Sequence, residues 1–144
     1  MLKNILVPIS SDGLTRSDIK KLLKIIGPDV KKITLAFVSD PIPTYLYAAY
    51  GDAMTISNAD HRQLCQSFAE TLFAKVGPKL EGIKCEACHI FNVNIVDGII
   101  EAAKKSKAEL IAMRSHKRRG LAGIFMGSDT HRVIVGTNLP VLVV

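Results

Sequence analysis

The sequence lacks the long apolar stretches and leader segments that mark membrane and exported proteins. No apolar run approaches the roughly 20 residues that a membrane-spanning helix needs. The N-terminal run Ile5-Leu6-Val7-Pro8 is about four residues long, whereas the core of a signal peptide takes about 7–15. We therefore expect a cytoplasmic protein with no membrane anchor.

Cysteine is scarce, and its count is odd. The chain has three, Cys65, Cys85 and Cys88, which is not the even set of a disulfide framework. Free thiols are the expectation in a reducing compartment. Internal repeats and low-complexity segments are absent as well. The 144 residues suit a single domain, 1–144, with one hydrophobic core.

One short motif, Cys85-Glu86-Ala87-Cys88-His89, matches the pattern for covalent haem attachment. That attachment normally needs an exported chain. The motif also falls in a predicted strand, where residues three apart point to opposite faces. A zinc site fails on the same geometry, and no second cysteine pair exists. We therefore expect neither haem nor a metal here.

Acidic residues are outnumbered by basic ones, and the formal net charge is +6 with a pI of about 9.3. Such a balance suits either solubility alone or contact with phosphates and nucleic acid. The densest basic cluster is Arg114, Lys117, Arg118 and Arg119, with His116 among them. Because the cluster is compact, without an extended basic stripe, nucleic acid is a disfavoured partner and a small anionic ligand is a candidate.

Apolar periodicity indicates strands that alternate with helices. The expected strands are 4–9, 33–38, 83–91, 110–113 and 140–144, and the helical stripes are 19–26, 65–76, 95–103 and about 127–135, the last stopped by Gly136. This order predicts an α/β fold, a three-layer doubly wound five-stranded parallel sheet with helices on both faces.

The expected fold by itself indicates where a ligand binds. In doubly wound sheets the site lies outside the carboxyl ends of the strands, where the strand order reverses. The segments that follow those ends are 8–12, 38–41, 91–94 and 113–123.

Three segments resemble the universal stress protein family. They are Ile5-Leu6-Val7-Pro8, the stretch Ala108-Glu109-Leu110-Ile111-Ala112-Met113-Arg114-Ser115-His116, and Gly127-Ser128 followed by Asn138-Leu139-Pro140-Val141-Leu142-Val143-Val144. The resemblance spans the chain. It implies the adenine nucleotide alpha hydrolase-like fold and a stress-response protein that binds and regulates. The alternative that it implies is an ATP-binding switch with slow ATP hydrolysis.

The nucleotide-binding branch of that family carries Gly, two residues, Gly, nine residues, then Gly-Ser or Gly-Thr. Gly127-Ser128 matches the end of this motif, but Arg114 and Lys117 occupy the first two glycine positions. Glycine lets backbone amides approach a phosphate, whereas Arg and Lys bind anions through their side chains. Two kinds of ligand therefore remain open. One is ATP or another adenine nucleotide, with Mg²⁺, and the other is a different anion.

Two other positions depart from the family's pattern. Ser10 stands where the family usually has an acidic residue, and Asn92-Val93-Asn94 stands where it often has a glycine. Val38 matches the family's valine whose backbone faces the adenine. The expected ligand-binding residues are Pro8, Ile9, Ser10, Val38, Met113, Arg114, Ser115, His116, Lys117, Gly127 and Ser128.

Catalysis by a serine–histidine–aspartate triad is not expected. Ser115-His116, and Ser128-Asp129 with His131, contain the residue types of a hydrolytic triad. Sequence neighbours seldom face each other, however, and no Gly-x-Ser-x-Gly elbow is present.

The expected partner is a second copy of the chain. The last strand, Val141, Leu142, Val143 and Val144, is strongly apolar and a candidate sheet edge. Unpaired edges tend to be covered or paired, and in the resembled family this strand pairs with its copy in a two-fold dimer. The alternative is a strand buried within one subunit.

Overall fold

The structure, a computed structural model, describes residues 2–42, 57–114 and 128–144. The elements in chain order are β1 (Asn4–Pro8), α1 (Arg16–Ile26), β2 (Lys32–Ser39), α3 (Asn58–Val76), the 3-10 helix η2 (Gly77–Lys79), β3 (Lys84–Phe91), α4 (Ile95–Ser106), β4 (Leu110–Met113), α5 (Ser128–Gly136) and β5 (Val141–Val143). All the strand pairs are parallel, and the strand order is β3-β2-β1-β4-β5.

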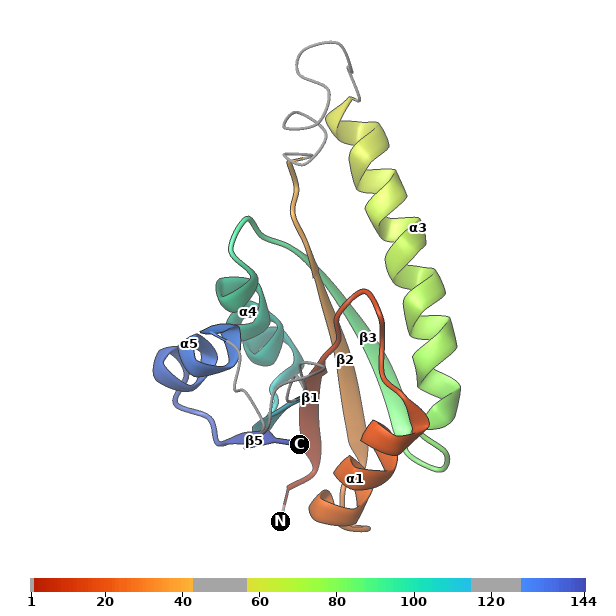
Figure 1. Cartoon of the computed structure of the whole chain (residues 1–144), viewed down its shortest axis with the longest axis vertical. Helices are drawn as coiled ribbons and strands as arrows, with labels where there is room; N and C mark the ends of the chain where they lie inside the picture. Colours follow the sequence, from red (N-terminus) through yellow and green to blue (C-terminus); the bar gives the residue numbers. More distant parts are fainter. Residues whose placement is uncertain (1, 43–56, 115–127) are drawn as a thin grey trace, which may run out of the picture.

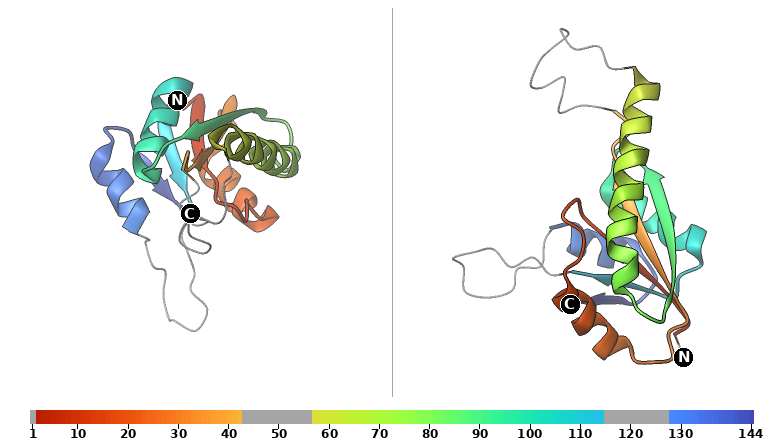
Figure 2. Two further views of the ribbon diagram at one scale, coloured as in Figure 1. Left: turned by 90° about the horizontal axis from the view of Figure 1, so that it is seen from above. Right: turned by 90° about the vertical axis from the view of Figure 1, so that its right-hand side faces the viewer.

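Helices cover both faces of the sheet. Figure 1 shows α1 and α3 on one side of the strands and α4 and α5 on the other, and the two views of Figure 2 agree. Side-chain alternation along β1 explains the two layers, because Ile5 and Val7 join the core under α1 and α3 while Leu6 joins the core under α4 and α5. The predicted three-layer doubly wound fold is confirmed.

Helix α3 is longer than its apolar stripe. The stripe predicts a helix from Cys65, but the helix begins at Asn58, with the Ser57 hydroxyl accepting a hydrogen bond from the Asp60 N–H. Most side chains of this first part are exposed, and Figure 1 shows it extending past the strand ends. It faces little of the core, so periodicity could not reveal it.

Helix α5 ends one residue later than the sequence predicts. We expected Gly136 to stop the helix, but it is the last helical residue.

The cysteines of β3 lie on opposite faces of the sheet, as predicted. Cys85 packs against the core under α1 and α3, and Cys88 packs against the core under α4 and α5. Both are free thiols. In the described ranges, no group of three or more His, Cys, Asp and Glu side chains is placed to hold a metal ion. None of the described helices combines the length and hydrophobicity needed to cross a bilayer.

Candidate functional site

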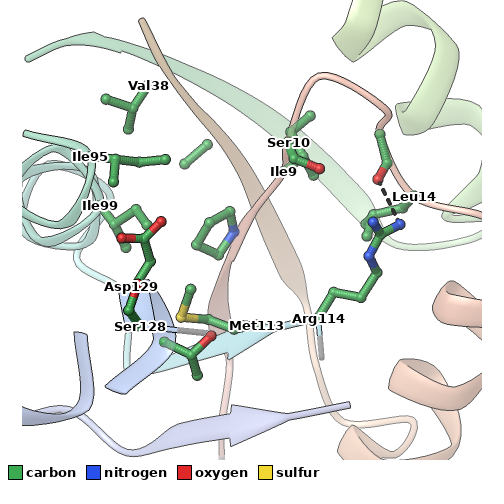
Figure 3. A pocket seen from close by; sticks show the side chains of 14 residues that line it. Ile9, Ser10, Leu14, Val38, Ile95, Ile99, Met113, Arg114, Ser128 and Asp129 are labelled. Carbon is green, nitrogen blue, oxygen red and sulfur yellow. Dashed lines mark hydrogen bonds between the residues drawn. The ribbon is translucent and has the colours of Figure 1, made fainter. Parts of the chain in front are cut away.

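A pocket of about 250 Å³ lies at the carboxyl ends of the central strands. The chain adds β2 and β3 on one side of β1 and then places β4 on the other side. The strand order therefore reverses between β1 and β4, where ligands bind in folds of this class. The lining residues are Pro8, Ile9, Ser10, Gly13, Leu14, Ala36, Val38, Ile95, Ile99, Met113, Arg114, Ser128, Asp129 and Thr130 (Figure 3).

Every predicted site residue that the structure describes lines this pocket. These are Pro8, Ile9, Ser10, Val38, Met113, Arg114 and Ser128. Ser115, His116, Lys117 and Gly127 lie outside the described residues. We did not predict the other lining residues, which are Gly13, Leu14, Ala36, Ile95, Ile99, Asp129 and Thr130. Of these, Ile95 and Ile99 share one face of a helix that follows a strand end, a pattern that could have found them.

One wall of the pocket is apolar, and Gly98 on α4 sets its position. A Cβ added at Gly98 would lie 2.6 and 2.8 Å from the two Cγ atoms of Val38. Only glycine lets the α4 backbone approach the end of β2 this closely. Figure 3 shows Val38, Ile95 and Ile99 along this side, with Met113 below them. The wall offers an apolar surface against which a ring could lie.

The asparagines that depart from the family's pattern hold the start of α4. The Asn94 side-chain oxygen accepts hydrogen bonds from the Val96 and Asp97 N–H groups at 3.0 and 3.2 Å, which caps the helix. The Asn92 side-chain oxygen in turn accepts one from the Asn94 N–H at 2.9 Å. Their role in the structure is to fix the helix end beside the apolar wall.

The loop between β1 and α1 forms the opposite wall. Gly13 has a φ of +71°, which favours glycine, and its N–H donates to the Ser10 carbonyl at 2.9 Å. The Ser10 hydroxyl donates to the Asp12 carboxylate. That hydrogen bond and a second one from Arg114 lower the pKa of Asp12 to about 2. Asp12 is therefore ionised throughout the physiological range.

Arg114 is held by carboxylates of the same chain. Its guanidinium lies 2.8 Å from the Asp12 carboxylate and 3.4 Å from that of Asp18, and it donates at 3.5 Å to the Gly13 carbonyl. From the sequence we expected Arg114 to neutralise a bound anion. In the structure it already neutralises protein carboxylates, because the β1–α1 loop and α1 bring two of them to the end of β4. Figure 3 shows its side chain extended towards that loop.

Helix α5 begins at the pocket with Ser128. The first N–H groups of a helix have no partner within it, and they favour an anion. In this helix Asp129, in the first turn, places a half-buried carboxylate in the pocket beside Ile99 (Figure 3). The described structure records no hydrogen bond or ion pair for this carboxylate. Among the charged groups of the described walls, Arg114 is already paired, so the Asp129 carboxylate is the one available to contact a ligand.

The described residues do not assemble a hydrolytic triad in the pocket. Ser128 and Asp129 line it, whereas His131 lines a separate hollow between α4 and α5. A different serine–histidine pair, absent from the sequence analysis, joins Ser39 and His89 at 2.7 Å on the face covered by α3. Burial lowers the pKa of His89. Neither residue lines the pocket, and the parallel register of β2 and β3 explains how they meet.

Comparison with known proteins decides the family. The sequence pattern of the Universal stress protein family matches residues 1–144. The chain belongs to this family. Universal stress protein MJ0531 from Methanocaldococcus jannaschii is 28% identical over 146 residues, which span 100% of this chain and 82% of that protein. The family resemblance inferred from the sequence is confirmed.

Solved structures share the fold. The structure of the hypothetical protein MJ0577 matches with a TM-score of 0.71 at 24% identity, over 100% of this chain and 96% of that one. A universal stress protein from Archaeoglobus fulgidus, solved in complex with dAMP, matches with a TM-score of 0.55 at 15% identity, over 99% and 98% of the two chains. Another universal stress protein, solved in complex with cAMP, matches with a TM-score of 0.54 at 16% identity, over 99% of this chain and 96% of that one. At these identities the likeness shows the fold alone.

Proposed function

We propose that this universal stress protein binds an adenine nucleotide in the pocket above β1 and β4, and that it acts by binding rather than by catalysis. The observation that carries the proposal is the pocket itself. It combines an apolar wall with a few polar groups at the point where the strand order reverses. A base would lie against Val38, Ile99 and Met113, and the sugar would lie towards Ser128 and Asp129.

The size of the pocket supports a small ligand. Its volume of about 250 Å³ lies just under the roughly 300–1,000 Å³ of pockets that hold drug-sized ligands. Two proteins that share the fold were solved in complex with cAMP and with dAMP, which each carry one phosphate. An adenosine monophosphate is therefore the ligand class that we propose for this chain.

Isothermal calorimetry with AMP tests the proposal, using a variant that fills the pocket. Ile95 is the first residue of α4, lines the pocket and is 47% exposed, so Ile95→Trp adds bulk there without opening the core. Val93→Trp is the matched control, because Val93 is 68% exposed, two positions away and not part of the lining. We expect AMP to bind the wild type and Val93→Trp alike, and Ile95→Trp to lose at least tenfold in affinity.

Two results would contradict the proposal. One is the absence of any heat of binding at millimolar AMP. The other is equal binding by Ile95→Trp and the wild type, which would place the ligand elsewhere. Release of phosphate from ATP, at a rate that Ile95→Trp abolishes, would instead favour the ATP-hydrolysing switch.

For the partner, we propose a second copy of the chain paired through β5. This strand is the last in the sheet order, so its outer edge has no partner strand within the described residues. The Val144 N–H donates to the Met113 carbonyl at 2.9 Å. Since N–H groups alternate along a strand, that of Val143 points to the free edge. Val143→Pro therefore removes an edge donor while keeping the pairing with β4.

Sedimentation measurements on the wild type and Val143→Pro test this partner. We expect a dimer for the wild type and a larger monomer fraction for the variant, with the same melting temperature at high dilution. A monomeric wild type at high micromolar concentration would refute the dimer.

A further inference from the structure

The positive groups of the described pocket walls are already next to carboxylates of the protein, which does not favour the binding of several phosphates. Two features of the described walls are positive, the Arg114 guanidinium and the N-terminus of α5. Each already has a carboxylate of the protein beside it. Arg114 contacts Asp12 and Asp18, and α5 carries Asp129 in its first turn.

The group around Arg114 is net negative. The single guanidinium lies 2.8 Å from Asp12 and 3.4 Å from Asp18. Its one positive charge balances one of these two carboxylates, so the group keeps one net negative charge. The Ser10 hydroxyl also donates to Asp12, so it is not free to donate to a phosphate. A phosphate that reached Arg114 would have to displace a carboxylate that is already in place, and it would lie beside a second one.

Asp129 adds a further negative charge on the other side of the pocket. Its carboxylate is half-buried next to Ile99, and no described residue is recorded as its partner. A carboxylate accepts hydrogen bonds and donates none when ionised. It therefore suits the hydroxyl or amino groups of a ligand and repels additional phosphates.

Resting on the proposed function, we propose that the pocket discriminates against polyphosphates, taking adenosine and AMP in preference to ATP, and that Asp129 sets this preference. The hydroxyl groups of the sugar donate to Asp129, and the base lies on the apolar wall formed by Val38 and Ile99. Each phosphate beyond the first adds negative charge to a pocket whose described walls carry an excess of it. Lys117, Arg118 and Arg119 lie outside the described residues.

The test compares the affinities of adenosine, AMP and ATP for the wild type and for Asp129→Asn, by calorimetry with a chelator present so that no cation masks the phosphates. We expect the wild type to bind ATP roughly tenfold or more weakly than adenosine. Asp129→Asn loses about tenfold in adenosine affinity, as a hydrogen bond to a charged group is removed. It also gains in ATP affinity, so the preference shrinks or vanishes.

Asp97→Asn is the matched control. Asp97 likewise lies in the first turn of a helix, α4, but it is exposed and does not line the pocket. This variant removes the same charge from the protein, and we expect it to leave the adenosine-to-ATP ratio unchanged. A second variant, Asp12→Asn, frees one side of Arg114 and is expected to raise the affinity for ATP.

The outcomes separate this inference from the function on which it rests. ATP binding as tightly as adenosine to the wild type overturns the inference and leaves adenine nucleotide binding intact. A ratio that Asp129→Asn leaves unchanged, or that Asp97→Asn moves equally, overturns the role of Asp129. No binding of any of the three ligands overturns the proposed function itself.

Discussion

Arg114 and Asp12, 102 positions apart in the sequence, meet at 2.8 Å at the edge of the pocket. The contact joins the end of β4 to the loop after β1, the two segments between which the strand order reverses. Arg114 therefore links two parts of the pocket wall, although its position in the sequence suggested that it binds an anion. We call this Arg114–Asp12 contact the clamp. The consequences for stability, packing and ligand choice can each be measured.

Arg114→Met breaks this clamp and makes stability less dependent on acid pH. The Ser10 and Arg114 hydrogen bonds lower the pKa of Asp12 from 3.8 to about 2. A lowered carboxyl pKa contributes stability that is present above about pH 4 and is lost as the pH falls through about 2. Because the Asp12 side chain is 65% exposed, we expect at most about 1 kcal/mol.

Urea unfolding of the wild type and Arg114→Met between neutral pH and about pH 2 checks this expectation. The difference between the two proteins should be largest at neutral pH and should shrink as the acid limit is approached. Arg132→Met, an exposed arginine on α5, is the control and should behave as the wild type. A difference that grows towards low pH would contradict the clamp.

Gly98→Ala should destabilise the protein and narrow the pocket. The new methyl group would overlap both Cγ atoms of Val38, at 2.6 and 2.8 Å. Overpacking of this kind costs about 1–3 kcal/mol, which outweighs the roughly 0.5–1 kcal/mol that alanine gains over glycine in a helix. Thermal unfolding measures the loss. The double variant Gly98→Ala, Val38→Ala should recover part of it, and failure to recover would place the strain elsewhere.

The two β3 thiols should stay reduced and react slowly. Burial raises the pKa of Cys85, as does the nearby Glu86 charge, and burial raises the pKa of Cys88. Since the thiolate is the reactive form, alkylation of both by iodoacetamide should be slow at neutral pH and should accelerate as the pH rises. Peptide mass spectrometry reports each site. A disulfide between Cys85 and Cys88 in the native protein would contradict their placement on opposite faces.

His89 should lose its proton at a lower pH than a free histidine. Burial lowers its pKa below 6.5, and Ser39 lies 2.7 Å from its Nε2. The unfolded chain takes up a proton near pH 6.5 while the folded one resists it, so stability falls as the pH drops below that value. NMR titration of the ring gives the pKa directly. A value above 6.5, or a stability that rises on acidification in this window, would contradict the assignment.

Local patterns were enough to predict the layers of the fold, and the strand-end rule was enough to predict the pocket. Val38 and Met113 were found because each ends an apolar strand, and ligands gather at such ends in parallel sheets. The Arg114–Asp12 pair could not be found, because side-chain direction depends on contacts between segments that are distant in the sequence. Asp129 was missed for a related reason. It was weighed as a possible triad member, and nothing in its neighbours shows that it points into a cavity.

Methyl NMR of the wild type during addition of AMP tests the central claim most directly. The account predicts saturable shifts of the Met113 methyl and the Ile99 δ-methyl, which line the pocket, and none at Ile19, a residue of α1 whose side chain is buried in the other layer. The contrary result is saturable AMP binding that leaves the Met113 and Ile99 signals unmoved.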